Sequence, residues 1–237
     1  MKANGDDNAM KFSATFFAIF FLFLSGCTES VSRDSSARIL TMGDSLLASH
    51  GMSGNAVSDV LERALGRPVI DRSVMGARII YHLPISGSAG LNIAKQFRVG
   101  DWDWVVLNGG GNDLWLGCGC IVCKNKLDRL SRKDGKGGEI PSLIQEIRKT
   151  GAKVVYVGYL RSPGLGSPIE HCRDEGDELE RRIARFAAFD DGVHMVSLKD
   201  MVPFGDRSFH AADMIHPSRK GSAAIAARVA EVIRTDG

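Results

Sequence analysis

The chain has no strong excess of charge of one sign, no internal repeat and no low-complexity tract. Its formal net charge is only +2, so the composition gives no indication of a nucleic-acid partner. The glycine patterns that cradle phosphates or dinucleotides are also missing. What is present is 44% hydrophobic residues in 237, which is enough for a sizeable core in one α/β domain.

The longest apolar run lies near the N-terminus, from Phe12 to Leu24, and Lys11 precedes it. Such a run is short for a transmembrane helix but typical of the apolar core of a signal peptide. It ends in Leu-Ser-Gly-Cys, which resembles a bacterial lipobox with Cys27 as the residue that takes the lipid. An ordinary signal peptide or a short membrane anchor is the alternative.

This N-terminal pattern gives an expected domain organisation. Residues 1–26 are predicted to be a signal peptide, residues 27–36 a polar linker, and residues 37–237 the folded domain. A lipid on Cys27 would tether an exported chain to a membrane surface without spanning the bilayer. We therefore expect a periplasmic or cell-surface location.

Four further cysteines, Cys118, Cys120, Cys123 and Cys172, remain in the predicted mature chain. Export to an oxidising compartment favours disulfides, and four cysteines allow three pairings between which the sequence does not choose. A zinc site is the alternative, because these thiols and His171 are suitable ligands. We favour disulfides and expect no metal or organic cofactor.

From residue 37 onward, short apolar runs alternate with longer amphipathic ones. Strands are predicted at 37–42, 69–74, 104–108, 153–159 and 193–198. Helices are predicted at 56–65, 89–97, 140–149, 174–189 and 218–234. This alternation is typical of βαβ units, and it predicts a three-layer α/β/α sandwich around about five parallel strands. In such sheets the functional site lies at the carboxyl ends of the strands.

The polar motifs of interest follow those strand ends. Gly-Asp-Ser-Leu, with Ser45 as its serine, follows the first predicted strand, and Gly76 follows the second. Gly-Gly-Gly-Asn-Asp, which includes Asn112, follows the third. Asp213-Met-Ile-His216-Pro precedes the last predicted helix. Each motif alone is a weak signal, but their joint occurrence in this order is much more specific.

These motifs resemble the four blocks of the SGNH (GDSL-type) hydrolases over most of the predicted mature chain. The resemblance implies a flavodoxin-like fold and hydrolysis of carboxylic esters through an acyl-serine intermediate. It assigns the nucleophile to Ser45, the general base to His216 and the residue that orients the imidazole to Asp213. The oxyanion donors would be the backbone N–H groups of Ser45 and Gly76 and the side-chain amide of Asn112.

The substrate stays open at this stage: an acetyl group on a glycan and an acyl chain on a lipid or thioester are both compatible with the motifs. A related O-acyltransferase and a non-catalytic, glycan-binding surface lipoprotein are the alternative functions. A cysteine-bearing insert at about 116–138 is expected to be a loop over or beside the substrate pocket. A bulky side chain at Gly76 is expected to obstruct close approach to the backbone.

Several other side chains are candidates for the site or for the loops around it. Asp44 and Asp113 are expected to hold loops through backbone hydrogen bonds. His210 is expected to be a solvent-exposed loop residue, although it lies close to Asp213 in the sequence. Arg78 and Arg161 follow strand ends and are candidates to meet an anionic substrate.

Overall fold

The computed structural model describes residues 36–164 and 166–236. Within them one five-stranded sheet is built from β1 (Ile39–Met42), β2 (Val69–Asp71), β3 (Trp104–Leu107), β4 (Lys153–Val157) and β5 (Val193–Val196). The strand order is β2-β1-β3-β4-β5 and every neighbouring pair is parallel. The predicted parallel sheet is therefore confirmed. The signal peptide, Cys27 and all of the linker except Ser36 lie outside the described residues.

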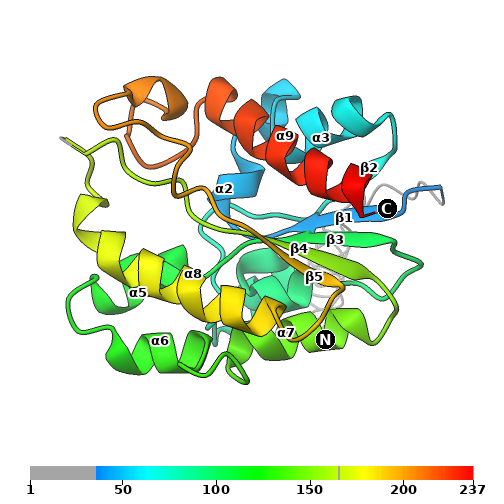
Figure 1. Ribbon diagram of the computed structural model, residues 1–237, viewed down its shortest axis with the longest axis horizontal. Coiled ribbons are helices and arrows are strands. Elements are labelled where there is room, and N and C mark those ends of the chain that lie inside the picture. Colours follow the sequence, from blue (N-terminus) through cyan, green and yellow to red (C-terminus); the bar gives the residue numbers. More distant parts are fainter. Residues whose placement is uncertain (1–35, 165, 237) are drawn as a thin grey trace, which may run out of the picture. The chain divides into compact units, whose positions relative to one another are not determined.

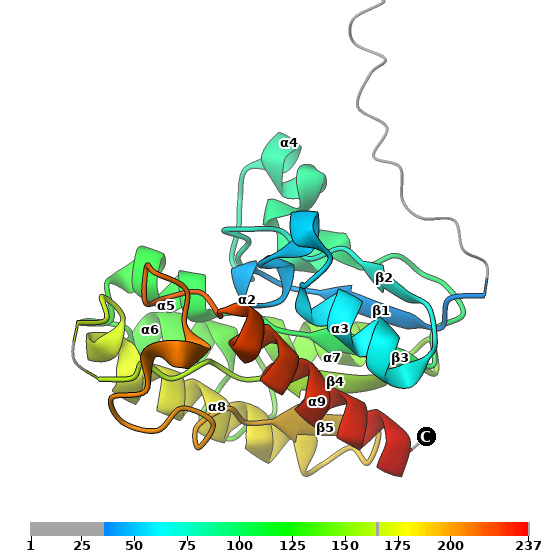
Figure 2. The ribbon, with the colours of Figure 1, turned by 90° about the horizontal axis from the view of Figure 1, so that it is seen from above.

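Helices cover both faces of this sheet (Figures 1 and 2). One face is covered by α2 (Ser45–Ala48), α3 (Val57–Leu65) and α9 (Arg219–Thr235). The other is covered by α5 (Gly111–Cys118), α6 (Lys124–Leu130), α7 (Glu139–Arg148) and α8 (Arg173–Ala187). Successive residues of β3 alternate between the two layers, since Val105 packs in the second and Val106 in the first. The expected three-layer sandwich is thus confirmed.

The ends of the helices follow local sequence signals. Helix α3 stops at Gly66, whose φ of 62° is left-handed and suits glycine. Helix α9 begins after Ser218, whose side chain accepts a hydrogen bond from the backbone N–H of Gly221. Both boundaries match the predicted helices to within a residue, which places the Asp213–Pro217 motif directly before α9.

The helix predicted over 89–97 is wrong. That stretch holds a π-helical turn at Gly87–Leu91 and a 3-10 helix at Ile93–Gln96, preceded by the short α4 (Pro84–Ser86). Gly90 has φ 106°, which no α-helix accommodates, and a Cβ there would meet the Val74 side chain. Three further 3-10 turns lie at Gly51–Ser53, Glu170–Cys172 and Arg207–Phe209.

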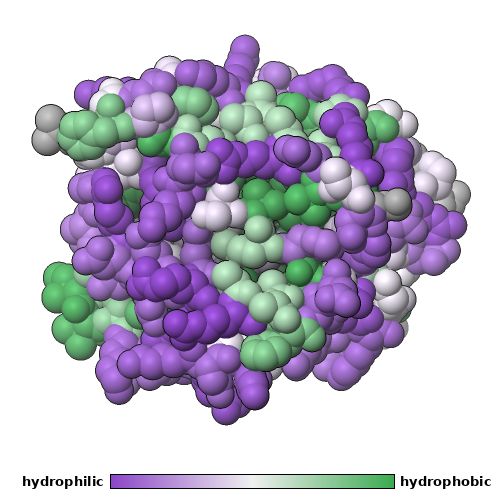
Figure 3. Space-filling view, viewed as in Figure 1, coloured by the Kyte–Doolittle hydropathy of each residue, from purple (hydrophilic) through white to green (hydrophobic). Residues whose placement is uncertain are grey.

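The insert at 116–138 is partly helical, which corrects the loop that was expected over its whole length. It contains the end of α5 and all of α6, whose Leu127 and Leu130 are buried in the core. In Figure 3 hydrophobic side chains gather at the lower left, where Figure 1 has the turn between these two helices. Ile121 and Val122 of that turn are 81% and 82% exposed.

Two disulfides brace the insert. Cys118 pairs with Cys123 inside it, and Cys120 pairs with Cys172 at the start of α8. The expected disulfides are therefore present, and the structure supplies the pairing that the sequence left open. No helix among the described residues has the length and apolar character needed to cross a membrane.

Candidate active site

A cleft opens at the carboxyl ends of β1, β3 and β4, where the sequence motifs were expected to meet. Its lining includes Ser45 after β1, Asn112 after β3, Tyr159 after β4 and His216 before α9. Parallel strands bring these segments together because all their carboxyl ends lie at the same edge of the sheet.

Ser45 is the first residue of α2 and is 9% exposed at the floor of the cleft. The side chain of Asp44 caps this short helix by accepting the backbone N–H of Leu46 at 2.9 Å. The backbone carbonyl of Ser45 accepts the hydroxyl of Ser49 at 2.6 Å. The turn is thus fixed by its neighbours, and the Ser45 hydroxyl is left available on the cleft side.

His216 and Asp213 form a tight pair on one short loop. Asp213 Oδ2 lies 2.5 Å from His216 Nδ1, and Asp213 Oδ1 accepts the backbone N–H groups of Ile215 and His216 at 3.0 Å each. Burial alone would raise the pKa of Asp213, but these hydrogen bonds lower it by more, so the pKa lies below its ordinary value. A carboxylate accepts, so Nδ1 carries the proton and Nε2 is left as the basic nitrogen.

His216 and Ser45 line the same cleft, but among the described residues no hydrogen bond joins the serine hydroxyl to the imidazole. Such bonds are often long before substrate arrives and shorten in the complex. The His216 side chain is 28% exposed, so solvent and a small ester can both reach it.

Asn112, in the first turn of α5, contacts the loop that contains Gly76. The Asn112 side-chain amide donates to the carbonyl of Ala77 at 3.0 Å, and Asp113 accepts the backbone N–H groups of Ile79 and Ile80 at 2.9 and 2.8 Å. Gly76 has φ 76°, and a Cβ there would meet no atom within 4 Å. This left-handed backbone conformation favours glycine, and the open space leaves the backbone accessible.

Asp44 and Asp113 hold loops, as expected. Both carboxyl groups are buried, and burial raises the pKa of Asp44 from 3.8 to about 6. Burial raises the pKa of Asp113 as well, against its two backbone donors. Neither is paired with His216, so the aspartate that orients the imidazole in this structure is Asp213.

Tyr159 is a cleft residue that none of the sequence motifs contains. Its hydroxyl and that of Tyr156, the latter at 2.5 Å, both donate to the carbonyl of Gly109. Burial raises the pKa of both phenols well above the ordinary value, so they stay neutral donors. A Cβ at Gly111 would collide with the Tyr159 ring. Tyr159 lies two residues past the end of β4, so the strand-end rule alone could have identified it.

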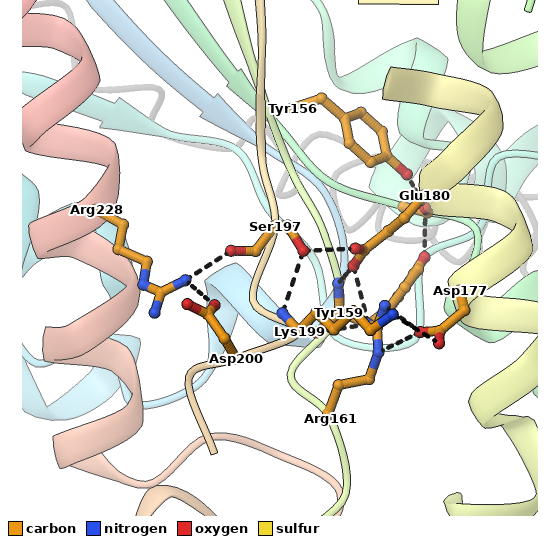
Figure 4. Close-up of polar contacts among 10 residues, drawn as sticks. Tyr156, Tyr159, Arg161, Asp177, Glu180, Ser197, Lys199, Asp200 and Arg228 are labelled. Atoms are coloured by element: carbon orange, nitrogen blue, oxygen red, sulfur yellow. Dashed lines mark hydrogen bonds and ion pairs between the residues drawn. The ribbon is translucent and has the colours of Figure 1, made fainter. Parts of the chain in front are cut away.

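Arg161 lines the cleft but already has carboxylate partners (Figure 4). Its guanidinium lies 2.7 Å from Asp177 and 2.9 Å from Glu180, and Glu180 also accepts the hydroxyl of Ser197 at 2.8 Å. Arg78 stacks over the Tyr81 ring and is not among the lining residues. Arg161 is therefore neutralised within the cleft, and Arg78 lies outside it.

Two other expectations about individual residues need correction or refinement. His210 is only 6% exposed, and neither ring nitrogen has a hydrogen-bond partner among the described residues, so it is not the solvated loop residue that we expected. The ligand atoms of Cys120, Cys172 and His171 lie within 4.8 Å of one another. The two cysteines are joined in a disulfide, however, so they lack the thiolates that a zinc site would need.

Solved structures with the same fold include several ester-cleaving proteins. A lipase/acylhydrolase from Enterococcus faecalis is 20% identical, covers 84% of this chain and 96% of its own, and superposes with a TM-score of 0.61. A carbohydrate acetylesterase from Sinorhizobium meliloti is 15% identical, with coverage of 85% and 100% and a TM-score of 0.62. An esterase from Pseudoalteromonas is 16% identical, with coverage of 83% and 96% and a TM-score of 0.55. At these identities the likeness establishes the fold.

The family assignment comes from the sequence itself. No curated protein matches the chain. Residues 41–224 match the family model described as the GDSL-like lipase/acylhydrolase family. That span runs from β1 into α9 and contains Ser45, Gly76, Asn112, Asp213 and His216. Family and fold together support ester hydrolysis as the general activity. The chain belongs to the GDSL-like lipase/acylhydrolase family.

Proposed function

We propose that this protein hydrolyses carboxylic esters with Ser45 as nucleophile. The observation that carries the proposal is the shared cleft of Ser45 and His216, with Asp213 hydrogen-bonded to the far side of the imidazole. A serine hydroxyl attacks an ester only if a base takes its proton as the bond forms. Because Nδ1 faces the carboxylate, Nε2 of His216 is the nitrogen available for that step.

The reaction runs through a covalent acyl-enzyme. The Ser45 oxygen attacks the ester carbonyl while His216 takes the hydroxyl proton. The tetrahedral intermediate then collapses, and His216 gives that proton to the departing alkoxide. Water, deprotonated by the same imidazole, attacks the acyl-serine, and the Ser45 oxygen leaves with the proton from His216 as the acid is released. Asp213 stabilises the imidazolium that forms in each half of the cycle.

The oxyanion of each tetrahedral intermediate needs donors that are already in place. The Ser45 backbone N–H, at the start of α2, and the Gly76 N–H are two of them. The Asn112 amide is the third: it has two N–H groups, and its bond to Ala77 uses one of them. That bond fixes the amide while it leaves the other N–H for the substrate oxygen, which supports its assignment as an oxyanion donor.

The test is turnover of short p-nitrophenyl esters by the wild type, Ser45→Ala and Ser142→Ala. Ser142 lies exposed on α7 and is not among the cleft residues, so it is a matched control. We expect Ser45→Ala to abolish turnover and labelling by a fluorophosphonate probe, and Ser142→Ala to keep both. Equal turnover by Ser45→Ala would remove this serine from the mechanism. A folded wild type that neither turns over esters nor reacts with the probe would favour a non-catalytic, glycan-binding lipoprotein. Product analysis with an added sugar acceptor distinguishes transfer to a sugar from hydrolysis.

We also propose that the protein is an exported lipoprotein anchored through Cys27. Two disulfides support an oxidising compartment, and the lipobox-like sequence supports lipid attachment. Cells that express the wild type or Cys27→Ala should be labelled with a radioactive fatty acid. We expect label only on the wild type, and equal labelling of both would refute attachment at Cys27.

A further inference from the structure

The lining of the cleft beyond the proposed catalytic residues is mostly apolar. It includes Leu114 and Trp115 from α5, Leu160 after β4, and Ile169 and Ile215 from loops. The two arginines in the lining already face carboxylates, Arg161 as described and Arg173 through Glu170. A glycan would need free donors and acceptors for its hydroxyl groups, whereas an alkyl chain gains free energy for each CH₂ group that it buries. The lining therefore suits an alkyl chain.

Gly176 extends the cleft along α8. It is buried and is one of the lining residues, yet a Cβ built on it would meet no atom within 4 Å. By contrast, a Cβ on Gly110 would lie 2.8 Å from the Leu179 side chain. The space beside Gly176 is thus empty although the residue itself is buried, so the cleft has room for ligand atoms at this point of the helix.

Neither backbone conformation nor packing accounts for a glycine at position 176. It lies inside the helix Arg173–Ala187 and is not among the glycines with positive φ. Glycine in a helix interior makes the helix less stable than alanine would. A side chain there would fill the cleft, so an open cleft is the one structural property that glycine preserves.

A disulfide holds this wall in place. Cys172 lies four residues before Gly176, on the same side of the chain as it enters α8, and also lines the cleft. Its bond to Cys120 joins α8 to the turn between α5 and α6, so the insert and the helix form one connected wall. The width beside Gly176 is therefore set covalently.

We propose that the cleft between α5 and α8 binds a linear alkyl chain of the ester substrate, longer than acetyl, and that Gly176 determines the length it accepts. The predicted effect of Gly176 on turnover rests on the proposed ester hydrolysis, whereas binding of the alkyl chain does not. The alkyl chain belongs to either the acyl side or the alcohol side of the ester, and two series of substrates distinguish these two cases.

The test compares Gly176→Ala and Gly176→Leu with the wild type and with Ala184→Leu, which places a leucine on the exposed side of α8. One series is p-nitrophenyl acetate to decanoate, and the other is ethyl to octyl acetate. For one of them we expect Gly176→Leu to lower kcat/KM for the long members at least tenfold more than for the shortest, with Gly176→Ala intermediate and Ala184→Leu unchanged. The series that changes identifies the side of the ester.

Folding and binding are measured separately from turnover. Both Gly176 variants should keep or raise the melting temperature, because they replace a helix-interior glycine. Calorimetric titration with octanoate and with 1-octanol should show at least tenfold weaker binding of one of them by Gly176→Leu than by Ala184→Leu. Unchanged length profiles in both series, or equal binding by these two variants, would overturn the inference. If the wild type cleaves no ester but Gly176→Leu still binds one ligand more weakly than Ala184→Leu does, the proposed function is wrong and the alkyl-chain site stands.

Discussion

The two disulfides should contribute unequally to stability, and the difference can be worked out from their loops. Cys120–Cys172 joins residues 52 apart in the sequence, whereas Cys118–Cys123 joins residues 5 apart. A cross-link stabilises mainly by restricting the unfolded chain, and the restriction grows with loop length. The relation gives about 4 kcal/mol for the long loop and about 2 kcal/mol for the short one.

The comparison has a built-in control. Each pair contains one nearly buried cysteine, Cys120 at 6% and Cys123 at 3% exposed, and one partly buried cysteine. Replacing either pair with alanine therefore removes similar packing, and that cost largely cancels between the two double variants. The difference of about 2 kcal/mol that remains is assigned to the loops.

The assay is urea unfolding of the wild type, Cys120→Ala/Cys172→Ala and Cys118→Ala/Cys123→Ala, followed by tryptophan fluorescence. We expect the first double variant to be the less stable of the two by about 2 kcal/mol. In dithiothreitol the wild type should lose stability relative to its oxidised form. Equal stability of the two double variants within about 0.5 kcal/mol, or the reverse order, would refute the loop argument.

Three further predictions concern single side chains. Burial raises the pKa of Asp44 to about 6, so the folded state keeps a proton that the unfolded chain has lost between about pH 4 and 6. The free energy of unfolding of Asp44→Asn, measured in urea, should therefore rise relative to that of the wild type by up to about 3 kcal/mol as pH increases through this window. A difference between the two proteins that does not change with pH would contradict this prediction. Burial lowers the pKa of His210, so the unfolded chain binds this proton first on acidification and stability falls below about pH 6.5. Below about pH 6.5, His210→Phe should lose less free energy of unfolding than the wild type on acidification. Parallel pH profiles of stability for the two proteins would exclude a contribution from His210. Asn112→Ala should lower kcat about 10²- to 10³-fold with little change in KM, and an unchanged kcat would exclude Asn112 as an oxyanion donor.

The sheet was predictable because its signals are local. Each strand is a short apolar run, and the strands alternate with helical patterns, which left few possible topologies. The helix predicted over 89–97 was wrong because apolar spacing alone suggested it, whereas Gly90 has a φ of 106° that an α-helix does not accommodate. The prediction for the insert was wrong in the other direction: a loop was expected, but Leu127 and Leu130 gain burial by forming a helix. In both places a backbone or packing requirement overrode the composition.

The proposed catalytic residues and the cleft wall differ in how far the sequence determines them. Attack, proton transfer and oxyanion binding each need particular atoms about 3 Å apart, so they require fixed residue types at fixed turns. Ser45, Asn112 and His216 could be named from motifs for that reason. A wall for an alkyl chain needs only an apolar surface and empty space, which many residue types provide. Nothing in the pattern of α8 singles out Gly176, because its role depends on the crossover from β4 to β5 and on a disulfide that spans 52 positions. Family motifs in such a chain therefore indicate the bond that is cleaved, while the choice of substrate is set by long-range contacts that only the folded structure brings together.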